Sequence, residues 1–236
     1  MSKLSPIRTA IQSVGRPEKV ALYQRFFQTA PGQYGEGDRF VAARVPDLRV
    51  IARRHAGDLG LPEIEELLHS PIHEERFVAL VILTDHYERE RSPRQVIVDL
   101  YLRNTSYINN WDLVDVSAHK IIGVHTLAKP FPFLSDLTGS PLVWDRRIAV
   151  IATLTHSKHK NPVPILTLAE LLLPDPHPLM HKAVGWMLRE MGKACGRAPL
   201  MKFLDENAPV MPRTMLRYAI EKLPKEEQKH YLNLPR

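Results

Sequence analysis

The sequence is poor in the residues that support disulfides, tight turns and membrane spans. Its 236 residues include one cysteine, Cys195, which excludes an internal disulfide and a metal site built from several cysteines. The apolar run from Ala79 to Leu83 is typical of its runs, far below the roughly 20 residues that a membrane span needs. The N-terminal residues contain no apolar stretch of the signal-peptide kind. We therefore expect a cytoplasmic protein with no membrane partner.

Glycine is also scarce, with 11 residues against 20 prolines, which argues against β-hairpins because their turns favour glycine. Many prolines instead stand where an apolar pattern of helical spacing begins, as in PDLRVIARR, PRQVIVDLYLRN and PRTMLRYAIEKL. Proline is tolerated there because the first N–H groups of a helix have no partner within it. No segment alternates strictly between apolar and polar residues. The sequence predicts an all-α fold of ten to fourteen helices.

A weak internal repeat refines this prediction. Five predicted helices align on one column of residues, at spacings of 36, 34, 36 and 34: Ala79, Asp115, Ala149, Gly185 and Ala219. Such a period, with two helices per unit, is typical of an α-α superhelix of HEAT-like repeats. An irregular helical bundle stays open as the alternative. Asp115 is the one member that is not small, and we expect function where a local rule is broken.

The basic residues are unevenly distributed. The net charge is +6, and the stretch from Pro141 to Leu204 holds nine Lys or Arg side chains against four acidic ones. On stacked helices, a basic stretch would line one face and suit a polyanion such as nucleic acid. A solvated basic surface without a partner is the alternative interpretation.

Each of the three tryptophans lies one helical turn from a charged residue. The pairs are Trp111 with Asp115, Trp144 with Arg147, and Trp186 with Arg189. Side chains at these spacings share a helix face. Tryptophan more often packs in a core, and a lone aspartate more often forms a salt bridge or a cap. Together, however, aromatic faces, a carboxylate and arginines suit a substrate that joins a cationic base to a phosphodiester backbone.

Other catalytic chemistries find little support in the sequence. It contains no HExxH, no GxSxG and no glycine-rich phosphate loop. His156 and His159 are interpreted as part of a polar, basic loop, and Cys195 has no evident partner that would stabilise a thiolate. We therefore expect no metal, no nucleotide and no other cofactor.

Five segments in the same order carry a resemblance to a known family. They are YGEGDRFVAARVPDLR, NNWDLVDVSAHKIIG, VWDRRIAVIATL, HKAVGWMLREMGK and RTMLRYAIEKL. The sequence resembles the AlkD family of bacterial DNA alkylation-repair glycosylases, which are built from HEAT-like repeats. The resemblance covers most of the chain, so it implies a single helical-repeat domain over residues 1–236.

The resemblance also implies roles for individual residues. Trp111 and Asp115 match the tryptophan and the essential aspartate of the family's WDxVD helix, and Arg147 matches its arginine. Trp186 matches a second pocket tryptophan. The implied activity is excision of cationic N3- or N7-alkylated purines without base flipping. Asp115 would stabilise the oxocarbenium-like sugar and position water, and Arg147 would hold a backbone phosphate.

Several further residues are candidate DNA contacts. Arg189, one turn after Trp186, lies in the basic stretch, and Tyr23 lies on the second predicted helix. Two positions depart from the family pattern. Arg44 stands where the family has a glutamine, and Thr155 replaces a basic residue, with Lys158 and Lys160 nearby.

Two other functions remain open beside the glycosylase. One is a non-catalytic HEAT-like protein that binds branched or distorted DNA, and the other is a scaffold for protein partners. Asp115 favours the enzyme, because a carboxylate repels phosphates and a pure binder has no need of it. We expect a monomer that acts on double-stranded DNA carrying alkylated bases in the bacterial cytosol and nucleoid.

Overall fold

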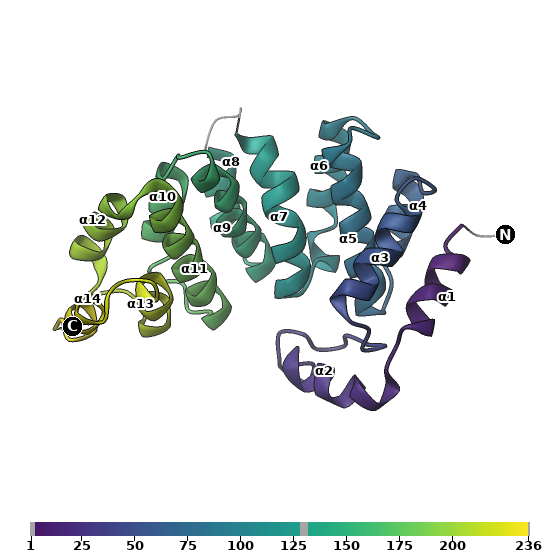
Figure 1. The fold of residues 1–236 in the computed structure, drawn as a ribbon, viewed down its shortest axis with the longest axis horizontal. Helices are drawn as coiled ribbons and strands as arrows, with labels where there is room; N and C mark the ends of the chain where they lie inside the picture. Colours follow the sequence, from purple (N-terminus) through teal and green to yellow (C-terminus); the bar gives the residue numbers. More distant parts are fainter. Residues whose placement is uncertain (1–2, 128–131, 236) are drawn as a thin grey trace. The chain divides into compact units, whose positions relative to one another are not determined.

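The computed structural model describes residues 3–127 and 132–235, and within them the chain is all-α (Figure 1). The fourteen α-helices of these residues are α1 (Ser5–Ser13), α2 (Val20–Phe26), α3 (Val45–His55), α4 (Leu61–Leu68), α5 (His73–Glu88), α6 (Arg94–Arg103), α7 (Trp111–Thr126), α8 (Pro132–Thr138), α9 (Val143–Lys158), α10 (Val163–Leu171), α11 (Pro178–Cys195), α12 (Arg197–Asn207), α13 (Arg213–Ile220) and α14 (Lys225–Leu232). Two short 3-10 helices lie at Pro17–Lys19 and Thr105–Tyr107. Arg39 and Ile72 form an isolated β-bridge. Among the described helices, none is long and apolar enough to cross a bilayer.

Prolines mark the starts of the helices, as the sequence predicts. Pro178 is the first residue of α11, Pro46 lies in the first turn of α3, and Pro62 lies in the first turn of α4. Pro93 and Pro212 directly precede α6 and α13. Because proline fixes φ and lacks an N–H group, it favours the first turn and costs more anywhere later in a helix.

The chain divides into two compact units, residues 1–117 and 118–236, and α7 begins in the first and ends in the second. Unit 1 is built around α5, of which 13 of 16 residues are buried. Helices α3 and α4 both pack on α5, and α1 packs on α3 and α5. Sheltered by its neighbours on several sides, α5 carries polar as well as apolar residues into the interior of this unit.

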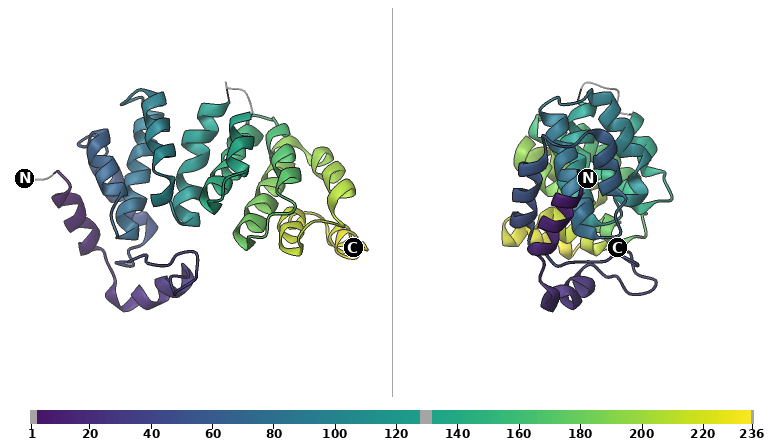
Figure 2. Two further views of the ribbon diagram at one scale, coloured as in Figure 1. Left: turned by 180° about the vertical axis from the view of Figure 1, so that it is seen from behind. Right: turned by 90° about the vertical axis from the view of Figure 1, so that its right-hand side faces the viewer.

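Unit 2 has the regular pattern of a helical repeat. Helices α9, α11 and α13 pack side by side, while α10 packs on both α9 and α11, and α12 packs on α11 (Figure 2). Every second helix is therefore in direct contact with its counterpart in the next pair. This is the packing that two-helix repeats produce when each buries its apolar face on the next.

The predicted column of small residues lies on every second helix. Its members fall on α5, α7, α9, α11 and α13, and all of them except half-buried Asp115 are buried. Gly185 shows why small residues are needed, because a Cβ atom there would lie 2.6 Å from the Cβ of Tyr218 on α13 and would also meet the Met215 carbonyl oxygen. The predicted repeat is thus confirmed where α11 crosses α13.

Candidate functional site

The first two turns of α7 carry the aspartate and tryptophan that the sequence singles out. Asn110 is fully buried, and its Oδ1 accepts a hydrogen bond of 2.9 Å from the backbone N–H of Trp111, which fixes the start of the helix. Trp111 and Asp115 lie one turn apart, so they share a face, and each is half-buried. Both side chains are therefore anchored on a helix yet partly open to solvent.

Trp111 stands against a group of phenylalanines that the sequence did not reveal. Its ring stacks on Phe27 at 5.4 Å between centroids with an angle of 17°, and it meets the edge of Phe26 at 5.6 Å. Phe27 in turn stacks on Phe40 at 5.0 Å. Phe26 is 61% exposed although it is a large apolar residue. The result is an aromatic surface that continues from Trp111 towards solvent and suits a flat or cationic ligand.

A buried network of charged side chains lies directly beneath this aromatic surface. His73, the first residue of α5, contacts Asp38 through Nδ1 at 3.0 Å and Asp112 through Nε2 at 2.9 Å. Arg76 donates to the other oxygen of Asp38 at 2.6 Å, to Asn109 at 3.1 Å, and to the Ser70 carbonyl oxygen at 3.0 Å. The network connects the segment before α3, α5 and the start of α7.

The charges in this network stabilise one another. Burial alone would lower the pKa of His73, but the negative charge of Asp112 and hydrogen bonds to Asp112 and Asp38 outweigh it and raise that pKa to about 9. Burial would likewise raise the pKa of Asp38, but His73 and Arg76 hold it below its usual value. At neutral pH the network therefore holds the cations of His73 and Arg76 beside the carboxylate of Asp38, with the Asp112 carboxyl group on the other side of the imidazole.

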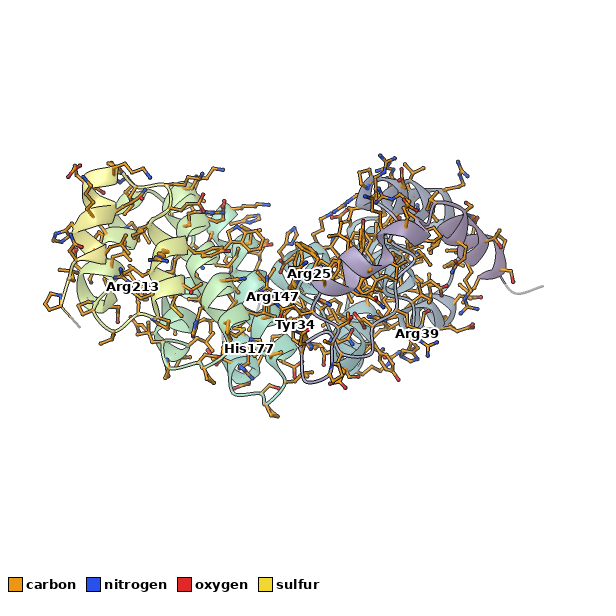
Figure 3. The ribbon with its side chains drawn as sticks, turned by 90° about the horizontal axis from the view of Figure 1, so that it is seen from below. Arg25, Tyr34, Arg39, Arg147, His177 and Arg213 are labelled. Carbon is orange, nitrogen blue, oxygen red and sulfur yellow. The ribbon has the colours of Figure 1, made fainter. Side chains whose placement is uncertain are left out.

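In unit 2, the predicted arginine, Arg147 on α9, bonds to the first turn of α11. Arg147 is 4% exposed, and its Nη1 donates to the Leu179 carbonyl oxygen at 2.9 Å. His177 precedes α11, and its Nδ1 accepts from the Leu179 N–H at 3.2 Å. Figure 3 labels Arg147 and His177 where α9 meets the beginning of α11. Trp144, one turn before Arg147, is buried, so it packs in the core.

The other predicted residues of α11 are placed differently. Trp186 is half-buried on this helix, which packs directly on the α9 that carries Arg147. Arg189 is paired with two carboxylates, Glu190 at 2.9 Å and Glu221 after α13. Two carboxylates therefore face the positive charge of Arg189. Its role as a DNA contact stays a prediction.

The remaining candidates are dispersed over the two units. In unit 1, the hydroxyl of Tyr23 donates to the Ala43 carbonyl oxygen at 3.2 Å, and exposed Arg44 pairs with Asp47 at 2.9 Å. In unit 2, Lys158 is exposed at the end of α9, and the ammonium group of Lys160 donates to the Ala194 carbonyl oxygen. Unit 1 therefore carries Trp111, Asp115, Tyr23 and Arg44, and unit 2 carries the rest.

One local prediction is wrong, because His156 does not lie in a loop. It occupies the last turn of α9, is 5% exposed, and bonds the Thr126 hydroxyl at 2.9 Å. Burial lowers its pKa. The sequence shows a polar, basic stretch there, yet one face of the final helical turn still reaches the core. His159 is the residue that ends the helix.

Several cations in the basic stretch of unit 2 are paired with carboxylates, so fewer of them are open to a ligand than the composition suggests. Arg146 pairs with Asp175 at 2.7 Å, and Arg197 pairs with Glu227, which lies outside the stretch. Lys158, Lys182, Lys193 and Lys202 remain exposed. The surface charge that DNA could meet is therefore carried largely by these lysines.

Comparison with known proteins agrees with this geometry. The sequence profile of a family described as DNA alkylation repair enzyme matches residues 7–223. This chain belongs to that family. A search of curated proteins found no match.

A solved structure shares the fold of this DNA alkylation repair family member. A predicted DNA alkylation repair enzyme from Enterococcus faecalis is 18% identical, with a TM-score of 0.71, and the match covers 89% of this chain and 97% of that chain. The likeness confirms the all-α superhelical repeat fold. The family assignment gives the chain a role in the repair of alkylated DNA. The match spans both units, although their boundary falls within α7.

Proposed function

We propose that the protein is a monofunctional DNA glycosylase that excises cationic N3- and N7-alkylated purines from duplex DNA. The observation that carries the proposal is the pair formed by Trp111 and Asp115, half-buried on one face of α7 and next to an exposed aromatic surface. A carboxylate beside an aromatic face suits a reaction in which positive charge moves from a base to a sugar. The family membership supports alkylated DNA as the substrate.

The proposed reaction begins with a base that already carries a positive charge. The bond between the purine nitrogen and C1′ breaks, its electron pair stays with the purine, and the purine leaves as a neutral molecule. The sugar becomes oxocarbenium-like, and the carboxylate of Asp115 stabilises it. Water then adds to C1′ and loses a proton, which Asp115 is placed to accept. The products are the free alkylated purine and an abasic site, and no cofactor takes part.

The other predicted residues would hold the DNA. The Trp111 face attracts the cationic lesion, and Trp186 contacts the nucleotide that carries it. The lesion stays stacked in the duplex, as the family resemblance implies. Arg147 and Arg189 hold backbone phosphate, and Tyr23, Arg44, Lys158 and Lys160 add contacts along the backbone. We propose that the protein acts as a monomer, as one functional domain, in the bacterial cytosol and nucleoid.

The decisive experiment compares base release by the wild type and Asp115→Asn on duplex DNA containing 7-methylguanine. The substitution keeps the shape of the side chain and removes its charge, so release should fall at least about 100-fold. Duplex affinity should hold or rise, because a repulsive charge is lost. Asp99→Asn is the matched control, since Asp99 is exposed on α6 of the same unit.

The opposite result would refute the proposal. If the wild type releases no more base than Asp115→Asn while both bind the duplex, the glycosylase proposal fails. The protein would then be a helical-repeat protein that binds damaged or distorted DNA without cleaving it.

A further inference from the structure

His73 lies where three segments of unit 1 meet. Its backbone N–H donates to the Arg39 carbonyl oxygen at 2.8 Å, next to the isolated bridge between Arg39 and Ile72. Its ring then contacts Asp38 at 3.0 Å and Asp112 at 2.9 Å. The side chain is 3% exposed. One buried residue therefore connects the segment before α3, the start of α5 and the first turn of α7.

The geometry favours a cationic His73. A neutral imidazole has one N–H and one acceptor nitrogen, and a carboxylate has only acceptor oxygens. Both ring nitrogens of His73 face carboxyl oxygens, and both contacts are satisfied when each nitrogen carries a proton. The charged groups that face His73 are Asp38, Asp112 and Arg76, while Phe27, which directly follows α2, and Phe40 are uncharged. With His73 protonated, these four charges cancel.

Two physical connections lead from His73 to Trp111. The first runs through Asp112, which is held by the imidazolium and is the chain neighbour of Trp111. The second runs through aromatic rings, because His73 lies 4.9 Å from Phe27 and Phe27 stacks on Trp111 at 5.4 Å. His73 also stacks on Phe40, with 4.6 Å between the ring centroids, so a second aromatic ring packs against the imidazole. Asp115 lies one turn beyond Trp111 on the same helix face.

We propose that His73 is a positioning residue for base excision, acting through Asp112 and Phe27 to hold Trp111 and Asp115 in the orientation the reaction needs. The proposal rests on the proposed function of Asp115 as the group that stabilises the sugar. Loss of the His73 proton would leave buried Asp38 with Arg76 as its one cationic partner and half-buried Asp112 facing a neutral ring. Asp112 would then lose its buried cationic partner, and the first turn of α7 would shift.

The first test reads the position of Trp111 without any substrate. The protein is labelled with 5-fluorotryptophan, and its three 19F resonances are assigned with single Trp→Phe variants. The Trp111 resonance of the wild type should shift with an apparent pKa near 9, the pKa of His73, while that of buried Trp144 in unit 2 should not. His73→Gln should abolish the shift. A Trp111 resonance that does not titrate, or that titrates equally in His73→Gln, overturns the proposal.

The second test reads the reaction itself, in single-turnover base release from 7-methylguanine duplex with enzyme in excess. His73→Gln should slow release at least tenfold and leave the Kd for the duplex within about twofold. The matched control is His86→Gln, because His86 is also buried in α5 but its ring bonds the Ala56 carbonyl oxygen, whereas the ring of His73 bonds Asp112 at the start of α7. Equal losses of rate in the two variants would overturn the positioning role.

A milder variant covers the case in which His73→Gln does not fold. Asp112→Asn keeps a hydrogen-bonding side chain but removes the charge that raises the pKa of His73 most strongly. The alkaline fall in the release rate should therefore move to lower pH, which a purely structural role would not produce. An unmoved alkaline limb overturns the proposal. If the wild type releases no base at any pH, the glycosylase proposal fails, and the 19F titration alone still judges whether His73 positions Trp111.

Discussion

The two units differ in their balance of acidic and basic side chains. Unit 1 has 15 basic and 16 acidic residues, and its arginines meet carboxylates, as in the pairs Arg76–Asp38 and Arg103–Glu65. Unit 2 has 17 basic and 10 acidic residues, and several of its cations donate to backbone carbonyl oxygens: Arg146, Arg147, Lys160 and Arg213. Unit 1 is therefore nearly neutral, with 15 basic against 16 acidic residues, whereas unit 2, with 17 against 10, retains an excess of positive charge that suits a polyanion.

In unit 2, α11 and α13 lie so close at Gly185 that a Cβ atom does not fit between them. A substitution at this contact should give the largest loss of stability. Gly185→Val would place a branched side chain against Tyr218 and Met215 on α13, where even a Cβ atom is too close. Overpacking of this kind should cost about 3 kcal/mol of the free energy of unfolding. Urea denaturation of the purified variant measures the loss.

Gly57→Val in unit 1 is the control for this prediction. A Cβ atom at Gly57 would meet only the Arg91 guanidinium, at 3.8 Å. We expect a change within about 0.5 kcal/mol. Similar losses in the two variants would show that close helix contact is not a special property of unit 2.

The buried ion network of unit 1 should make its stability depend on pH. Because the folded pKa of His73 is raised to about 9 from 6.5, its contribution is complete below pH 6.5 and is lost as pH rises through 9. The wild type should lose on the order of 2 kcal/mol between pH 6.5 and 9.5 relative to His73→Gln. Urea midpoints at several pH values give the difference. A constant difference between the two proteins would contradict a cationic His73.

The smallest expected effect is on duplex affinity, when one oriented arginine of unit 2 is removed. Arg147→Gln and Arg213→Gln each remove one positive charge and one hydrogen bond to a carbonyl oxygen, of Leu179 and Leu232 respectively. If Arg147 holds a phosphate, its loss should weaken duplex binding a few-fold and lower the slope of log K against log salt by about 0.9. Arg213→Gln should leave that slope unchanged. Equal slopes would remove Arg147 from the DNA contacts.

Local features of the sequence predicted much of the fold. Prolines mark the helix starts, and the column through Ala149, Gly185 and Ala219 follows from a period of two helices. The shared face of Trp111 and Asp115 follows from their spacing of four residues. These predictions succeed because each depends on residues within one helix or one repeat.

The parts of the site that the sequence did not reveal depend on contacts between distant residues. Asp38 and Asp112 lie 35 and 39 residues from His73, and no motif connects them. One partner of Arg147 is the Leu179 backbone carbonyl oxygen, which any residue at that position supplies. His156 was misplaced because the end of a helix and a loop share the same polar composition. Single-sequence patterns carry no information about which surfaces meet.

Helix α2 has a consequence for how the site responds to a bulky substrate. None of its seven residues is buried, whereas α5 buries nearly all of its length. Local opening therefore costs little free energy at α2 and approaches the cost of complete unfolding at α5. In the aromatic surface, Phe26 on α2 can therefore move at low cost, whereas the part that packs on His73 of α5 is held in place. If the lesion binds at Trp111 as proposed, a lesion of unusual size would displace Phe26 and leave Trp111 and Asp115 in place.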